Sequence, residues 1–132
     1  MKAYVLDASA LMAFLEDRAG AGKVEELLAK AAEAKRPLAM SVINWGEVHY
    51  SIWRAHGEKQ AKAKLQEIAQ LPVAIVDVDG EFGKLAATLK AVYNLPYADC
   101  FAAALAQSRK ATLVTSDHDF ERAGAALKIL WV

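Results

Sequence analysis

Five acidic side chains in this sequence stand close to the ends of apolar segments, where folding can bring distant residues together. They are Asp7, Glu47, Asp99, Asp117 and Asp119. Carboxylates brought together repel one another and raise each other's pKa unless a cation offsets their charge. Hard divalent ions such as Mg²⁺ and Mn²⁺ take oxygen ligands, so an acidic cluster can hold one. A divalent ion held there can lower the pKa of a water and neutralise charge on a phosphate during in-line displacement.

Each of these acids also has a purely structural interpretation. Asp7, Asp117 and Asp119 could each cap the N-terminus of a helix. Asp99 could be a first-turn residue favoured by the helix dipole, and Glu47 could be an exposed helix residue. Taken singly, each acid is explained better by structure, whereas convergence of all of them on one sheet edge would indicate a site.

The elements that must position these acids follow from the periodicity of the apolar residues. Strands are expected at residues 3–6, 38–40, 73–76, 112–115 and 128–132. Helices are expected from a cap at Ser9, at 21–35, from a cap at Ser41 or Asn44 to about His56 and Gly57, and at 58–70, 79–93 and 97–109. Strands that alternate with helices imply a mostly parallel sheet covered on both faces. Active groups gather at the carboxyl ends of the strands in such sheets.

The bulk composition predicts one folded domain over residues 1–132. The chain is 55% hydrophobic and has few glycines and prolines, which favours a helix-rich globule over a disordered chain. Sixteen basic and 16 acidic residues give no net charge, so any RNA contact must come from a local patch. With no signal peptide, no apolar segment of membrane-spanning length and a lone cysteine, Cys100, the expected location is the cytoplasm, away from membranes.

Four strings, in order along nearly the whole chain, resemble the PIN-domain family and, within it, the VapC-type toxins of prokaryotic toxin–antitoxin pairs. They are Val-Leu-Asp-Ala-Ser-Ala-Leu at 5–11, Asn-Trp-Gly-Glu-Val at 44–48, Tyr-Ala-Asp-Cys-Phe-Ala-Ala-Ala-Leu-Ala at 97–106 and Leu-Val-Thr-Ser-Asp-His-Asp-Phe at 113–120. The resemblance implies a three-layer α/β/α sandwich with a mostly parallel central sheet and an acidic pocket at one edge of that sheet.

The resemblance also implies a role for each residue that matches the family's pattern. The metal-binding and catalytic acids would be Asp7, Glu47, Asp99 and Asp117. Asp7 and Asp99 would be direct metal ligands, and Asp119 would be a supporting acid. Thr115 and Ser116 would help to hold water, metal or Asp117. Ser9 would orient Asp7 or serve only as a helix cap.

The activity implied by the resemblance is hydrolysis of RNA phosphodiester bonds by an endoribonuclease that depends on Mg²⁺ or Mn²⁺. A metal-activated water would be the nucleophile, and the products would carry a 3′-hydroxyl and a 5′-phosphate. The implied partners are the RNA substrate, a small antitoxin protein whose tail fills the acidic groove, and a second copy of the chain in a homodimer.

Two other functions stay open at this point. The string Ile-Val-Asp-Val-Asp-Gly at 75–80 resembles the nucleophile loop of haloacid-dehalogenase-type phosphatases, in which Asp77 would attack phosphate. Glu81 stands where those enzymes usually carry a hydroxyl residue, and only about fifty residues follow, so Asp79 is better interpreted as a helix cap. The other possibility is a catalytically silent PIN scaffold that binds a partner protein or RNA.

The remaining candidates for chemistry are histidines and aromatic residues. The three histidines show no metal-ligand spacing. His118, between two acids, could contact RNA but is also explained as an ordinary loop histidine. Trp45, Tyr50 and Trp53 share a predicted helix with Glu47 and are expected to make core or dimer contacts rather than to stack on bases.

Overall fold

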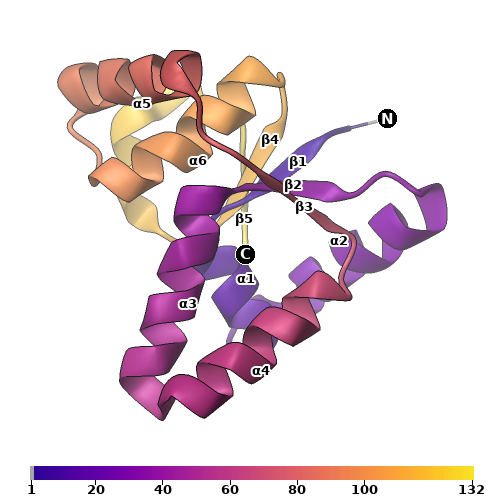
Figure 1. Ribbon diagram of the computed structural model, residues 1–132. Helices are drawn as coiled ribbons and strands as arrows, with labels where there is room; N and C mark the ends of the chain where they lie inside the picture. Colours follow the sequence, from indigo (N-terminus) through magenta and orange to yellow (C-terminus); the bar gives the residue numbers. More distant parts are fainter. Residues whose placement is uncertain (1) are drawn as a thin grey trace.

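In the computed structural model, which describes residues 2–132, the strands form one five-stranded sheet (Figure 1). They are β1 (Tyr4–Leu6), β2 (Leu38–Ser41), β3 (Val73–Val76), β4 (Thr112–Thr115) and β5 (Ile129–Trp131). The order across the sheet is β3-β2-β1-β4-β5, and every neighbouring pair is parallel. All five strands therefore end at the same edge of the sheet, which confirms the expected parallel arrangement.

Six α-helices and one 3₁₀ helix connect the strands of residues 2–132. The α-helices are α1 (Ala8–Leu15), α2 (Ala21–Ala34), α3 (Val42–His56), α4 (Glu58–Ala69), α5 (Gly80–Tyr93) and α6 (Tyr97–Ser108), and the 3₁₀ helix is η1 (His118–Ala126). The predicted helices and strands are all present, with small displacements of their ends, whereas η1 was not predicted. None of these helices is both long enough and apolar enough to cross a membrane.

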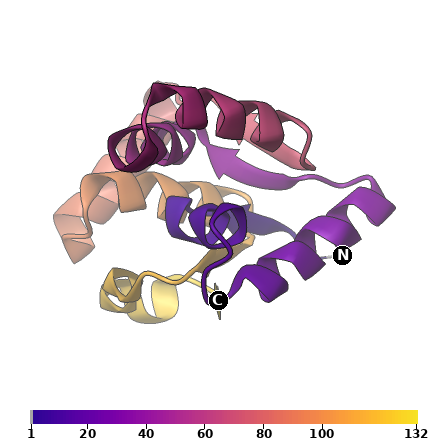
Figure 2. The same cartoon turned by 90° about the horizontal axis from the view of Figure 1, so that it is seen from below.

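Helices cover both faces of the sheet, because successive side chains of a strand point to opposite faces. Val5 of β1 and Leu113 of β4 pack with residues of α5, α6 and η1 in one core. Leu6 and Val114, the next residue of each strand, pack with α1, α2, α3 and α4 in a second core. The two helix layers can be followed in Figures 1 and 2. This arrangement confirms the three-layer α/β/α sandwich.

Helix caps explain how the chain leaves each strand and correct one expectation. The N-cap of α1 is Asp7 rather than Ser9, because β1 runs into the helix without a loop, and Asp7 Oδ1 accepts a hydrogen bond from the Ala10 amide at 2.8 Å. Ser41 caps α3, Gly57 ends it, and Asp79 caps α5 by accepting from the Phe82 amide at 2.8 Å. Those three caps agree with the sequence-based expectation.

The strand order places a topological switch point between β1 and β4. From the central strand β1 the chain builds β2 and β3 on one side and, much later, β4 and β5 on the other. Connections that leave neighbouring strands in opposite directions open a crevice at their carboxyl ends, where ligands bind in open α/β sheets. Asp7 follows β1 and Asp117 lies just beyond β4, so both acids stand at this crevice.

Candidate active site

The predicted acids converge where β1 and β4 end. Asp7 is the first residue after β1, Asp117 is the N-cap of η1 after β4, and Asp99 lies in the first turn of α6. Glu47 reaches the same place from α3. Burial and, to a smaller extent, the charge of Asp117 raise the pKa of Asp7, Glu47 and Asp99, so the four carboxyls lie close enough to influence one another.

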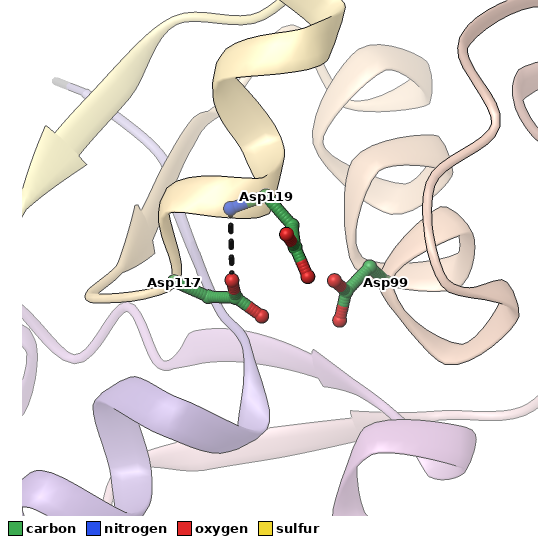
Figure 3. Close-up of side chains that lie close together, drawn as sticks. All are labelled: Asp99, Asp117 and Asp119. Carbon is green, nitrogen blue, oxygen red and sulfur yellow. Dashed lines mark hydrogen bonds between the residues drawn. The ribbon is translucent and has the colours of Figure 1, made fainter.

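Three of the carboxylates lie close enough to share one ion. One oxygen from each of Asp99, Asp117 and Asp119 lies within 4.8 Å of the other two, and within residues 2–132 this is the one such group of acidic, histidine or cysteine side chains. Figure 3 shows Asp99 reaching from α6 toward Asp117 and Asp119, which both come from the start of η1. Asp117 Oδ1 accepts a hydrogen bond from the Asp119 amide at 2.9 Å, so the turn itself orients Asp117.

Asp99 is the most deeply buried member of this group. Its side chain is nearly buried, 8% exposed, and its Oδ2 atom is buried without a hydrogen-bond partner. Burial, followed by the charge of Asp117, raises the pKa of Asp99 well above its ordinary range. A buried carboxylate oxygen without a partner is costly, so Asp99 needs either a proton or a cation. The donor set therefore fits a hard divalent ion.

Asp7 is held more rigidly than any other acid of the site. Ser9 Oγ donates to its Oδ1 at 2.8 Å and lies 3.0 Å from its Oδ2, and Thr115 Oγ1 donates to Oδ2 at 2.5 Å. Burial raises the pKa of Asp7 to about 6, against the lowering effect of these donors and of the Ala10 amide. Ser9 thus orients Asp7, one of its two expected roles, and the role of Asp7 as a direct ligand stays a prediction.

Hydroxyl groups tie the ends of β1 and β4 together. Thr115 Oγ1 accepts from the Asp117 amide at 2.9 Å while it donates to Asp7. Ser9 Oγ lies 3.2 Å from Thr115 Oγ1 and accepts from the Ser116 amide at 3.1 Å. Thr115 therefore positions both aspartates, whereas Ser116 takes part in this network through its backbone.

Asn44 positions Glu47, a function that was not inferred from the sequence. Asn44 is fully buried, and its Nδ2 donates to Glu47 Oε1 at 2.9 Å and to the Ala98 carbonyl at 3.0 Å. Its own Oδ1 accepts from Ser41 Oγ at 2.7 Å. The side chain thus links α3 to the residue before Asp99. The spacing of Asn44 and Glu47, three residues apart on one helix face, was the available signal.

A second group of acids lies at the end of β3, away from this cluster. Asp77 and Asp79 line a surface cavity of about 610 Å³ together with residues of α5 and with Arg109. Both aspartates are exposed, and Asp79 is engaged as the cap of α5. The acidic residues that line this cavity are all exposed, so it lacks a buried carboxylate. We therefore place the candidate site at the ends of β1 and β4.

Comparison with known proteins agrees with this fold. The family model described as PIN domain matches residues 4–126. A comparison with curated proteins found no match. Among solved structures, the chain is similar to a chain of VapBC2 from Rickettsia felis bound to a DNA fragment from their promoter, with 21% identity, a TM-score of 0.75 and 98% of each chain covered.

Two further solved structures have the same fold. One is DNA-bound VapBC from Salmonella typhimurium, with 18% identity, a TM-score of 0.76 and 98% of each chain covered. The other is VapC20 from Mycobacterium tuberculosis, described as a toxin that cleaves the sarcin–ricin loop, with 20% identity and a TM-score of 0.67. That match covers 92% of this chain and 95% of VapC20.

Proposed function

The chain belongs to the PIN-domain family, and we propose that it is a divalent-metal-dependent endoribonuclease that acts as the toxin of a toxin–antitoxin pair. The observation that carries the proposal is the group formed by Asp99, Asp117 and Asp119, in which a buried Asp99 oxygen has no protein partner. The similarity in fold to VapC20, a toxin that cleaves an RNA loop, supports RNA as the substrate class.

We propose that Asp99, Asp117 and Asp119 hold the metal, with Asp7 and Glu47 beside it. The assignment of Asp119 as a ligand extends the supporting role that the sequence suggested, because its carboxylate lies within the group. A bound Mg²⁺ or Mn²⁺ would lower the pKa of a nearby water and neutralise charge on the scissile phosphate. It would also offset the mutual repulsion that, after burial, raises the pKa of the clustered carboxyls.

The protein's own groups would position the reactants and move the protons. Ser9 and Thr115 fix the direction of Asp7, and Asn44 fixes Glu47. Glu47 is half-buried, with a pKa raised mainly by burial, which suits a carboxylate that accepts a proton from the attacking water. The water oxygen would bond to phosphorus, the bond to the 3′ oxygen would break, and that oxygen would take up a proton. The products would be a 3′-hydroxyl and a 5′-phosphate.

We also propose the protein partners that the family resemblance implies. The structures of similar fold include VapB–VapC complexes, which supports a small antitoxin protein as a partner of this chain. Its tail would cover the acidic groove and exclude RNA. A homodimer is the proposed assembly of the nuclease.

The two alternatives differ in the residue on which activity depends. The phosphatase would use Asp77, but the string 75–80 falls inside the PIN family match, and Asp79 within that string caps α5. A silent scaffold would show no metal-dependent turnover with any RNA. The nuclease depends on Asp99 and not on Asp77.

The test is cleavage of a mixed pool of transfer and ribosomal RNA by protein freed of any co-purified partner. Reactions would contain Mg²⁺, Mn²⁺ or a chelator, and the variants would be Asp99→Asn and, as the matched control, Asp77→Asn. We expect cleavage that requires metal, leaves 5′-phosphate ends, survives Asp77→Asn and is lost in Asp99→Asn. Cleavage that disappears with Asp77→Asn would contradict a nuclease site centred on Asp99, and a pool left intact with either metal would contradict the nuclease itself.

A further inference from the structure

An aromatic stack stands beside the acidic cluster and has no part in the function described so far. The imidazole of His118 lies against the indole of Trp131, with ring centroids 4.8 Å apart and planes inclined by 15°. His118 is the residue between Asp117 and Asp119 in the chain. The stack is therefore joined directly to the turn that carries two acids of the candidate site.

The sheet places Trp131 on the same face as the residue that organises the site. Trp131 of β5 pairs with Thr115 of β4, and residues paired in a parallel ladder project to the same face. Thr115 is the residue that donates to Asp7 and accepts from the Asp117 amide. Neighbouring strands lie about 5 Å apart, so Trp131 on β5 is one strand spacing from β4, which borders the acidic crevice.

His118 is held in place yet remains open to solvent. Its Nδ1 lies 2.9 Å from Glu121 Oε1, one turn along η1, and one ring face is backed by Trp131. Its side chain is nevertheless 75% exposed. A flat ring fixed at its edge and on one face, with its remaining surface in water, offers a prearranged surface on which another flat ring can stack.

We propose that His118, backed by Trp131, is a stacking platform for a nucleobase of the RNA next to the scissile phosphate. This inference rests on the proposed nuclease function and adds a way in which the protein binds its RNA substrate. A protein with no net charge has little general attraction for the RNA backbone, so base stacking would supply binding that charge does not. Because every base has a flat face, the platform would bind any unpaired nucleotide and would not select a particular base sequence.

The test compares binding of two fluorescent oligomers of equal length, oligoadenylate and a ribose–phosphate chain without bases, by fluorescence anisotropy at one salt concentration. The parent protein carries Asp99→Asn so that no cleavage intervenes. We expect it to bind oligoadenylate more tightly by a factor on the order of ten or more, the usual contribution of a stacked base. Adding His118→Ala should bring the ratio of the two affinities close to one.

Two further variants make the test specific to a flat ring at this position. His118→Phe should keep the preference for oligoadenylate, because phenylalanine can stack without the imidazole nitrogens. His56→Ala removes another exposed histidine, at the end of α3 where it faces Glu16, and should leave the preference unchanged. A preference that survives His118→Ala, that is lost in His118→Phe, or that the parent lacks would overturn the platform.

Cleavage of the RNA pool separates failure of this inference from failure of the proposed function. With residue 99 restored to aspartate, His118→Ala should cleave more slowly than the wild type while keeping its metal requirement. If His118→Ala cleaves the pool as fast as the wild type, the nuclease stands and the platform is wrong. If the wild type cleaves nothing, the nuclease itself is wrong, and the platform falls with it.

Discussion

Two strands of this sheet are followed by the same pattern, an aspartate, one other residue and a second aspartate. Asp77 and Asp79 follow β3, and Asp117 and Asp119 follow β4. In each pair one aspartate caps the next helix: Asp79 accepts from the Phe82 amide at 2.8 Å, and Asp117 accepts from the Asp119 amide at 2.9 Å. Both pairs therefore begin a helix, although Asp79, the second of its pair, caps the α-helix α5 and Asp117, the first of its pair, caps the 3₁₀ helix η1.

The ends of β3 and β4 differ in the elements that the sheet topology places beside them. β3 is an edge strand, and its two aspartates remain exposed beside an open cavity. β4 lies next to the central strand β1, where the buried Asp99 comes close to Asp117 and Asp119. A pair of acids at a strand end thus becomes a candidate metal site where other elements add a buried, unpaired carboxylate.

The largest effect is expected from neutralising Asp99, the buried carboxylate that lies beside the end of β4. Asp99→Asn should lower RNA cleavage by at least about 10²–10³-fold, the usual loss when a charge-stabilising group leaves an active site. The same variant should be more stable than the wild type without metal, because repulsion among buried carboxyls is relieved. Cleavage rates and urea unfolding measure the two effects. Loss of both activity and stability would indicate misfolding rather than loss of a metal ligand.

Stability against pH should also distinguish the clustered acids from the exposed ones. Because the pKa of Asp7 is raised from 3.8 to about 6, its contribution to folding is complete below pH 3.8 and is lost as the pH rises through 6. The metal-free protein should therefore lose up to about 3 kcal/mol of unfolding free energy between pH 4 and 7 through this residue. Urea unfolding in chelator measures that slope.

Two matched variants test whether Asp7 causes this dependence of the unfolding free energy on pH. Asp7→Asn should flatten it, and Asp77→Asn should leave it as in the wild type. Added Mn²⁺ should stabilise the protein most at the higher pH, because ionised carboxylates bind the metal. A slope that Asp7→Asn does not change would mean that Asp7 does not carry this free energy.

A smaller effect is expected from the residue that positions Glu47. Asn44→Ala removes a donor to Glu47 Oε1 and should reduce activity by about 10–100-fold, as loss of a residue that orients a metal-site ligand does. Because the Asn44 hydrogen bond lowers the pKa of Glu47, its loss should move the acid limb of the pH–rate profile to higher pH. A purely structural role would lower the melting temperature without moving that limb.

The smallest effect is expected at the β3 end. Asp79→Ala removes the N-cap of α5 and should cost about 1 kcal/mol of unfolding free energy. Metal affinity and cleavage should not change, because Asp79 lies outside the acidic group. Thermal unfolding together with the cleavage assay checks both parts, and a cleavage defect in this variant would remove the distinction between the two strand ends.

Sequence patterns were sufficient to predict the parallel sheet, its strands and the α-helices, because periodicity and caps are local properties, whereas the 3₁₀ helix η1 was not predicted. Periodicity and caps alone do not distinguish one pair of aspartates from the other, since that difference depends on which strands become neighbours, and it was the family resemblance that assigned Asp117 and Asp119 to the site. Ser9 was expected to cap α1, but Asp7 is the N-cap because the helix begins directly after β1 without a loop. The packing of Trp131 against His118 joins η1 to the edge strand, and no local pattern indicates it.

A metal site formed by Asp99, Asp117 and Asp119 can be tested by titrating Mn²⁺ and following the paramagnetic resonance signal of the free ion. The proteins would be the wild type, Asp99→Asn and Asp77→Asn at neutral pH, without RNA. We predict that the wild type and Asp77→Asn remove Mn²⁺ from solution equally well and that Asp99→Asn does not. Equal binding by Asp99→Asn and the wild type, or loss of binding in Asp77→Asn, would contradict a metal site at the ends of β1 and β4.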